Sequence, residues 1–374
     1  MSDIDVRSFV GMLLLGFLGS LGRVVSPVLP QYAEQLGASS MEIGLFFSAY
    51  SFTWTFLQLY TGYLSDKFGK KKFISLGLFI YGLFLILCGF SQNFLQLVIF
   101  RVLQGIGLGL FGPAALGLLA QAEEKGISFA FYRTANNLGS MVAPIIGGIL
   151  GSISLNYPFL FGGSLTLLAI LSVLLISEKK SPECEEKFGF IASLKSMVWT
   201  KKIISTCLAI FLVELTFASL DLMIPLSGST VGFSPATIGF ILSSYFITFA
   251  LFQIPIGAIS EKIDRKLLIC LCISTGTLPF LVFSFSTNAI AWSLASGALG
   301  VTVGTVFVQS SAYVAELAPE DKKSLYMAFF DSIIDYSFVI MPPIATYAYN
   351  CTPQAPFILC AFLLVIATMI FAKA

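Results

Sequence analysis

The chain has 374 residues, of which 57% are hydrophobic and 11% are charged, and its mean hydropathy is +0.91. Soluble domains carry about 25% charged residues, so this composition excludes a water-soluble globular protein and a disordered chain. The formal net charge of +1 provides no basic excess of the kind that binds nucleic acid, so no nucleic-acid partner is expected.

Long apolar runs separated by short polar segments predict an all-α membrane protein. A spanning helix needs about 20 apolar residues, and the chain has room for twelve such helices. The first run is not expected to be a signal peptide, because Asp3 and Asp5 replace a basic leader and no small-residue cleavage site follows. In chain order the predicted spans are 8–30, 43–64, 73–91, 94–119, 127–150, 157–177, 203–227, 237–258, 267–286, 289–315, 325–348 and 354–372.

The positive charges indicate which side of the membrane each connection faces. Of the 21 Lys and Arg residues, all but three lie at the chain ends or in the connections after even-numbered spans. Because positively charged loops stay in the cytoplasm, both termini are predicted to be cytoplasmic. We expect a multi-pass protein of the plasma membrane that works as a monomer, with the lipid bilayer as its surroundings.

The chain contains an internal repeat. Residues 37–74 align without a gap with residues 232–269, and 13 of the 38 pairs are identical, where roughly three would arise by chance. The alignment shifts every residue by 195 positions and continues to the pairs Gly105/Gly300 and Gly109/Gly304, and, after a three-residue insertion, Pro144/Pro342. The repeat predicts two pseudo-symmetric six-helix halves with a central cleft between them.

We place the halves at residues 1–177 and 203–374, joined by a linker at 178–202. The linker is the only long polar stretch of the chain, with six Lys residues and an apolar pattern at helical spacing. It is interpreted either as a short helix on the inner membrane surface or as a loosely ordered tether.

The connection after the second predicted span carries a recognisable motif. Gly62, Asp66, Gly69, Lys70 and Lys71 fit the pattern G-x-L-[small]-D-[basic]-x-G-[basic]-[basic], which resembles the loop signature of the major facilitator superfamily. The resemblance covers essentially the whole chain and implies a transporter fold. It also implies that Asp66 helps to set the inward/outward equilibrium, as this loop does in the family. Simple anchoring by the lysines is the alternative.

Two further stretches resemble helix motifs of the family. Arg101, Gln104 and Gly105 resemble the fourth-helix motif of proton-coupled members, in which the Arg lies in the cavity. The fifth span partly resembles the antiporter motif, with Ala143 in place of one glycine and Ala130 at the expected upstream glycine. It provides small or kinked positions for close helix packing: Gly139, Pro144, Gly147 and Gly148.

Charged residues inside the predicted spans are costly and normally face a cavity or a partner. They are segregated, with cations in the first half and acids in the second: Arg23, Arg101 and Arg133, then Glu214, Asp221, Asp331 and Asp335. The repeat places Arg23 opposite the helical stripe that carries Asp221. We therefore expect these two side chains to form an ion pair at the outer side of the membrane.

The chain has no His, so a carboxylate is the expected proton carrier. Glu214 lies near the middle of its span and is the first candidate, followed by Asp335. Asp331 and Asp335 are one helical turn apart, and carboxylates that share a low-dielectric site repel each other, which favours proton binding. The alternative is that the acids and arginines only pair with one another.

The sequence favours proton-coupled export of hydrophobic or cationic small molecules, and all four acids are candidate substrate or proton sites. The alternative is proton-coupled uptake of an anionic or polar metabolite bound by the arginines. A non-transporting receptor would have no use for seven buried charges. No metal site, cofactor or catalytic residue is expected, because the chain offers no metal-ligand cluster and no nucleophile beside a base.

Overall fold

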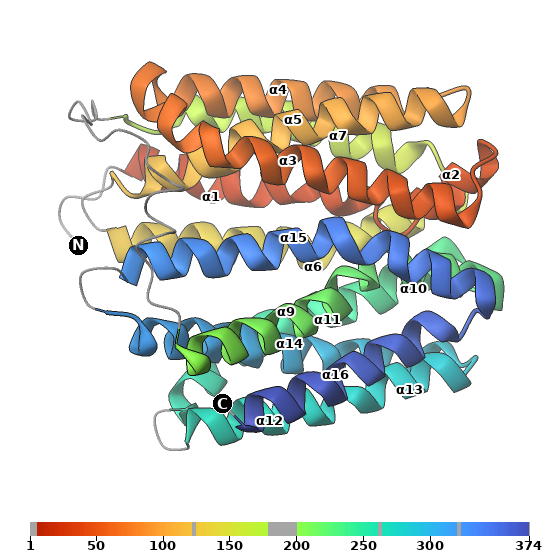
Figure 1. Cartoon of the computed structure of the whole chain (residues 1–374). Helices are drawn as coiled ribbons and strands as arrows, with labels where there is room; N and C mark the ends of the chain where they lie inside the picture. Colours follow the sequence, from red (N-terminus) through yellow and green to blue (C-terminus); the bar gives the residue numbers. More distant parts are fainter. Residues whose placement is uncertain (1–5, 122–124, 179–199, 261–263, 320–322, 374) are drawn as a thin grey trace.

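The computed structural model describes residues 6–121, 125–178, 200–260, 264–319 and 323–373, which are almost entirely helical (Figure 1). Within these residues there is no β-strand. The elements are α1 Val6–Ser20, η1 Leu21–Val25 (a 3-10 helix), α2 Leu29–Gln35, α3 Ser40–Phe68, α4 Lys70–Cys88, α5 Phe94–Leu119, α6 Lys125–Ile153, α7 Tyr157–Leu175, α9 Lys201–Ala218, α10 Leu220–Val231, α11 Pro235–Ser260, α12 Arg265–Thr275, α13 Thr277–Phe285, α14 Ala289–Leu317, α15 Lys323–Cys351 and α16 Ala355–Lys373.

The all-α fold predicted from the sequence is confirmed, but the exact number of spans is not. Ten segments of the described chain are long and apolar enough to cross a membrane. The second and eleventh predicted spans correspond to α3 and α15, which have 29 residues each but do not belong to that set. The count of twelve spans stays a prediction, and the interfacial helix predicted for the linker lies outside the described residues.

Three predicted spans each contain a break in the helix, although 7–25, 201–231 and 265–285 are each long and apolar enough to count as one span. The first is divided into α1, η1 and α2, where Pro27 and Pro30 provide no backbone N–H for a continuous helix. The ninth breaks at Gly276 between α12 and α13, because the ring of Pro279 conflicts with the carbonyl of Thr275 one turn earlier.

The seventh predicted span breaks at Ser219, between α9 and α10. Ser219 donates its hydroxyl to the carbonyl of Thr216 at 2.7 Å, and Thr216 donates its own to the carbonyl of Val213 at 2.7 Å. These bonds compete with the regular helical pattern and favour a bend. The bend lies between Glu214 and Asp221, so it sets the relative direction of two candidate site residues.

The helices form two groups that meet along two helix pairs (Figure 1). Helix α6 packs on α1 in the first group and on α11 in the second, while α15 packs on α9 in the second group and on α3 in the first. In Figure 1, α6 and α15 accordingly lie between the upper and lower helices. The division into halves at residues 178–202 stays a prediction, because most of that segment is outside the described residues.

The two contacts between the groups depend on two glycines at equivalent positions of the internal repeat. A side chain at Gly44 of α3 would meet the carbonyl of Pro342 on α15, and one at Gly239 of α11 would meet the carbonyl of Pro144 on α6. Gly44 and Gly239 are 195 residues apart, and the prolines are the repeat pair noted above. The repeat therefore extends from sequence to the packing between the groups.

The other motif glycines also mark close contacts. A side chain at Gly105 would lie 2.9 Å from the carbonyl of Tyr50, and one at Gly139 would lie 2.7 Å from that of Phe17. Gly147 faces the backbone of Val24. The helix-packing role proposed for these positions in α5 and α6 thus has a direct steric basis.

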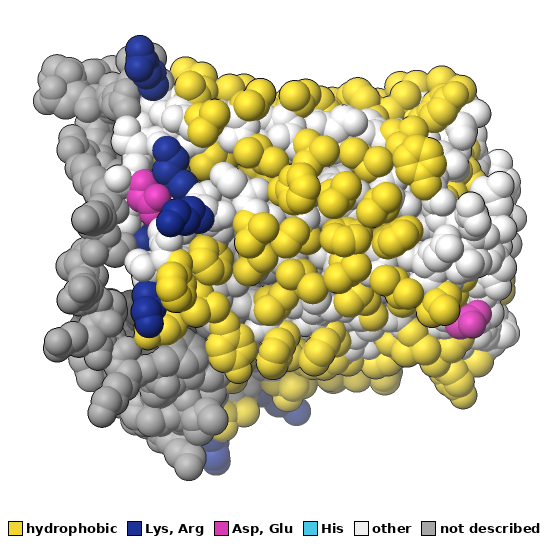
Figure 2. All heavy atoms as spheres, turned by 90° about the horizontal axis from the view of Figure 1, so that it is seen from above, with side chains coloured by type: hydrophobic (Ala, Val, Ile, Leu, Met, Phe, Trp, Pro, Cys, Tyr) yellow, Lys and Arg dark blue, Asp and Glu magenta, His cyan; other side chains and the backbone are white. Residues whose placement is uncertain are grey.

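The surface of the molecule fits a membrane environment. Figure 2 shows a broad belt of apolar side chains across the visible face, with most Lys and Arg side chains towards one end. Large apolar side chains such as Leu174 (74% exposed), Ile290 (71%) and Leu294 (71%) face outward. Contact of such a surface with lipid has no free-energy cost, whereas its exposure to water would be unfavourable.

Replacement of Gly148 by Leu tests the contact between α6 and α11. A side chain there would meet the backbone of Pro235 and lie 2.9 Å from the Cα of Ala236, so the helices must separate, at a cost of about 1–3 kcal/mol. We expect a lower midpoint of thermal unfolding for the purified protein. Gly112→Leu is the control, since no atom lies near a side chain at Gly112. Equal midpoints for the two variants would contradict the packing role.

Candidate functional site

Arg23 and Asp221 link the two helix groups. Arg23 lies in η1 and donates from Nη1 to Oδ2 of Asp221, in the first turn of α10, at 3.3 Å. The guanidinium also lies 5.2 Å from the ring centre of Phe246 on α11. The side chains are 45% and 25% exposed, so this pair adds little stability and can open at small cost.

Arg101 is held within the first group. It is buried in α5, donates to the side-chain carbonyl of Gln104 at 2.6 Å, and lies 4.1 Å from the ring centre of Tyr50 on α3. The aromatic face offsets part of the buried positive charge. The Nε2 of Gln104 is buried without a hydrogen-bond partner, so this polar cluster retains an unused donor.

Asp335 on α15 bridges the groups through Gln58 on α3, whose Nε2 donates to Oδ2 of Asp335. Asp331 lies one turn earlier, is exposed, and interacts electrostatically with Arg133 of α6, which is also exposed. No ion pair between Arg133 and Asp331 is found among the described residues. The structure therefore gives Asp335 a hydrogen-bond donor and Asp331 a distant cation.

Glu214 is the most enclosed of the candidate acids. It lies in α9 with 2% of its surface exposed, and no hydrogen bond or ion pair to it occurs in the described part of the chain. Asp335 is close enough to repel its charge, and Tyr245 is also within electrostatic reach. The hydroxyl of Tyr245 is buried without a hydrogen-bond partner.

Aromatic rings surround this region. Tyr245 stacks on Phe217, one turn after Glu214, with ring centres 5.0 Å apart, and lies 5.9 Å from Phe249. Phe217 also makes an edge contact with Phe338 of α15 at 5.7 Å. Helices α9, α11 and α15 thus bring rings to an acid that has no counterion.

The motif predicted to act as a switch lies in the connection between α3 and α4, where the chain turns at Gly69. Asp66 pairs with Lys70, and Gly69 has a φ of 103°, which only glycine adopts without strain. The carboxylate of Glu178, directly after α7, accepts from the backbone N–H groups of Lys70 at 2.6 Å and Lys71 at 3.3 Å. Glu178 therefore caps the start of α4, favourably oriented to the helix dipole.

Three residues of this arrangement had no role in the sequence-based prediction. Tyr50, Gln58 and Tyr245 occupy repeat positions, but only the structure shows that they lie near Arg101, Asp335 and Glu214, respectively. The sequence did contain a signal for these residues. The same polar or aromatic residue occurs in both halves of the repeat, inside apolar helices, at the pairs Tyr50/Tyr245 and Gln58/Gln253.

The helical bundle and its apolar belt indicate a multi-pass membrane protein. The sequence profile described as Major Facilitator Superfamily matches residues 9–226 and 206–374. The chain belongs to this superfamily, whose members are transporters rather than enzymes.

Named relatives agree with this assignment. The chain is 30% identical over 247 residues to the quinolone resistance protein NorA of Staphylococcus aureus (strain MSSA476), a match that covers 65% of the chain and 63% of NorA. The chain thus matches under two thirds of the length of that relative.

Solved structures share the fold at low identity. A mutant of the nucleoside transporter NupG superposes with a TM-score of 0.81, 14% identity and coverage of 98% and 99% of the two chains. A bacterial homologue of the human lysosomal transporter Spinster, in an inward-facing and unoccupied conformation, superposes with a TM-score of 0.79 and 15% identity. That match covers 99% of this chain and 97% of the homologue.

A charge swap tests the contact between Arg23 and Asp221. Arg23→Asp or Asp221→Arg places like charges together and should widen the distance between spin labels at Gln35 on α2 and Val231 on α10, measured by pulsed electron paramagnetic resonance. The double variant restores opposite charges and should restore the original distance. A double variant that stays as wide as either single variant would contradict the pairing.

Tyr50 variants test the contact with Arg101. Tyr50→Phe keeps the aromatic face and should unfold at a midpoint close to that of the original protein. Tyr50→Leu removes it and should lose about 0.5–2 kcal/mol of stability. The difference in stability between the Phe and Leu variants of Tyr50 should disappear when Arg101→Leu is also present. If it persists there, the ring acts through packing rather than through the cation.

Proposed function

We propose that the protein exports lipophilic cations in exchange for protons, with Glu214 as the main proton carrier. The single observation that supports this most directly is that Glu214 is enclosed without a hydrogen bond or ion pair in the described part of the chain. A buried carboxylate without a counterion is costly unless it binds a proton or a cation. A proton and a cationic substrate would therefore compete for one position, which is the basis of exchange.

The rings beside Glu214 suit the proposed substrate class. Phe217 and Phe249 are half-buried beside Tyr245, and Phe338 is half-buried beside Phe217. Aromatic faces attract cations while accepting apolar groups. Asp335 is a second site for a proton, because its repulsion of Glu214 makes simultaneous ionisation of both acids unfavourable. NorA is named as a quinolone resistance protein, and the similarity of this chain to NorA supports export of a drug-like compound.

The proposed cycle is alternating access. The Arg23–Asp221 pair and the Gly44 and Gly239 contacts hold the groups together at one end, and the Asp66 region lies at the other end, near the Lys side chains. We place this lysine-rich end, with both termini, in the cytoplasm, and the protein as a monomer in the plasma membrane. Opening of the end opposite the lysines would require the groups to separate at the Arg23–Asp221 pair and at the Gly44 and Gly239 contacts.

The competing function is proton-coupled uptake of an anionic or polar metabolite. The observation that favours it is the unused Nε2 donor of Gln104 beside the buried guanidinium of Arg101. Such a pair could bind a carboxylate or phosphate. In this case Arg101 and Gln104, rather than Glu214, would form the substrate site.

Transport in sealed vesicles separates these functions. The purified protein is reconstituted with a trapped pH-sensitive dye and an imposed pH gradient, and tetraphenylphosphonium, a quinolone or an organic anion is added. We expect the cations to accelerate collapse of the gradient, and Glu214→Gln to reduce this rate to that of protein-free vesicles. Glu34→Gln, at an exposed position of α2, is the control and should retain transport.

Other outcomes of this experiment are informative. Collapse driven by organic anions and abolished by Arg101→Gln would replace the export function with uptake. Substrate movement that is insensitive to both pH and Glu214→Gln would show that Glu214 carries no proton and would contradict the proposed coupling.

A further inference from the structure

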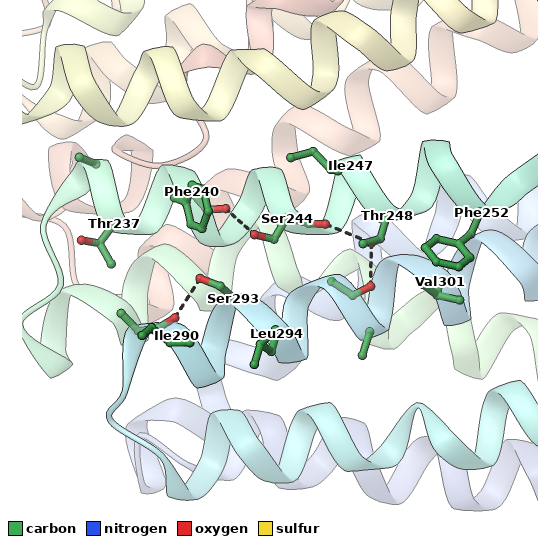
Figure 3. A pocket seen from close by; sticks show the side chains of 14 residues that line it. Thr237, Phe240, Ser244, Ile247, Thr248, Phe252, Ile290, Ser293, Leu294 and Val301 are labelled. Carbon is green, nitrogen blue, oxygen red and sulfur yellow. Dashed lines mark hydrogen bonds between the residues drawn. The ribbon is translucent and has the colours of Figure 1, made fainter.

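The hydroxyl group of Tyr245 in α11 is buried and has no hydrogen-bond partner among the described residues. The residue is 4% exposed. A tyrosine hydroxyl in such a place normally has a partner, and leaving it without one costs free energy. Two other hydroxyl groups of α11 are satisfied: Ser244 donates to the carbonyl of Phe240 at 2.9 Å, and Thr248 to that of Gly297 at 2.7 Å (Figure 3). Tyr245 therefore keeps an unused polar group at a cost to stability.

The internal repeat shows which partner this hydroxyl lacks. Tyr50, the equivalent residue of the first group, is hydrogen-bonded through its side chain to Tyr81. The residue of the second group that is equivalent to Tyr81 is Gly276, which has no side chain to offer. The partner present in the first group is thus missing from the second.

Gly276 takes the same place in the second group as Tyr81 does in the first. A side chain at Gly107 would lie 2.8 Å from the Cα of Tyr81. A side chain at Gly276 would lie 2.9 Å from the side chain of Thr302, which is the equivalent of Gly107. The contact between the two helices is therefore kept, and the change from Tyr to Gly has removed only the hydroxyl-bearing side chain.

Aromatic rings hold Tyr245 in position in spite of this loss. Phe217 of α9 stacks on its ring at 5.0 Å, Phe249 stacks at 5.9 Å, and Phe246 makes an edge contact at 5.1 Å. Phe217 is the equivalent of Gly22, where a side chain would collide with the ring of Tyr81. Both groups thus place a ring beside the repeat tyrosine, but only the ring in the first group carries a hydroxyl.

The hydroxyl of Tyr245 lies among the charged groups of the candidate site. Glu214, Asp221 and Arg23 all act on it electrostatically. Arg23 belongs to the first group and Asp221 to the second, so the hydroxyl lies near the boundary at which the groups would separate. An ionised carboxylate only accepts hydrogen bonds, and the hydrogen bond from Arg23 goes to Asp221. Tyr245 therefore offers a ligand at Glu214 the donor that the acid does not have.

We propose that the hydroxyl of Tyr245 determines specificity by donating a hydrogen bond to the exported cation. This inference rests on the proposed function and names its substrate class: lipophilic cations that also carry a hydrogen-bond acceptor, such as a carbonyl oxygen, on the apolar framework. Glu214 attracts the positive charge, and Tyr245 binds the acceptor. An analogue without the acceptor leaves the buried donor unpaired and binds less tightly.

Two cations of nearly identical shape test this role in the reconstituted vesicles. (4-Acetylphenyl)triphenylphosphonium carries a carbonyl oxygen where (4-isopropenylphenyl)triphenylphosphonium carries a CH2 group. We expect the acetyl compound to drive collapse of the pH gradient with a KM about 3–10-fold lower than that of the isopropenyl compound. Tyr245→Phe should raise the KM of the acetyl compound to that of the isopropenyl compound. The KM values of the isopropenyl compound and of tetraphenylphosphonium should stay unchanged.

The matched control is another buried tyrosine whose hydroxyl already has a partner. Tyr32 of α2 donates to the carbonyl of Ser91 at 3.3 Å, and Tyr32→Phe should leave the KM ratio of the two compounds as it is in the original protein. Tyr245→Phe removes no hydrogen bond, so its midpoint of thermal unfolding should not fall. If this variant does not transport, isothermal titration calorimetry of both compounds gives the same ratio as dissociation constants.

The results that would overturn the proposal are distinct from those that would overturn the proposed function. Equal KM values for the two compounds in the original protein would show that the site does not recognise the acceptor. An equal loss for both compounds in Tyr245→Phe would show that the hydroxyl serves Glu214 or the fold instead. If the original protein does not exchange tetraphenylphosphonium for protons, the proposed function fails, and the calorimetric ratio still decides the role of Tyr245.

Discussion

Close approach of helix backbones is the constraint on which the rest of this molecule depends. In a bilayer, lipid is as apolar as a leucine side chain, so helices associate through packing and polar contacts rather than through exclusion of water. Gly44 and Gly239 allow α3 to meet α15 and α11 to meet α6, each against the carbonyl of a proline. These contacts bring the two groups near enough for Arg23 to reach Asp221 and for Gln58 to reach Asp335. The polar network between the groups thus depends on these two close helix contacts.

Within this frame, the cost of buried charge is distributed unequally. Two of the three cations are compensated, Arg23 by a carboxylate and Arg101 by an aromatic face and an amide oxygen. Asp335 has an amide donor, whereas Glu214 has none among the described residues. A state with all acids ionised is therefore costly at Glu214, and under the proposed exchange the binding of a proton or a cation there would remove that cost.

The repeat is informative both where it holds and where it fails. Gly37 and Gly232 both have a positive φ, at 93° and 94°, and Asn93 and Asn288 both cap the helices that follow them. The second copy has Asp264 where the first has Gly69, and that side chain caps α12 instead of allowing a left-handed turn. The two groups thus share backbone geometry at several repeat positions and differ in the side chains there.

The sequence by itself determined the membrane class, the family, the approximate spans, the repeat and the segregation of cations from acids, because hydropathy, charge and motif spacing are local properties. The breaks at Ser219 and Gly276 were not predicted, since hydroxyl and proline effects on a helix depend on how its backbone bonds are satisfied. Only the tertiary structure decided that Arg101 meets Tyr50, that Gln58 meets Asp335 and that Glu214 stays without a partner. These outcomes depend on side chains from helices far apart in the chain, and their contacts are fixed only when glycines and prolines set the distance between helices.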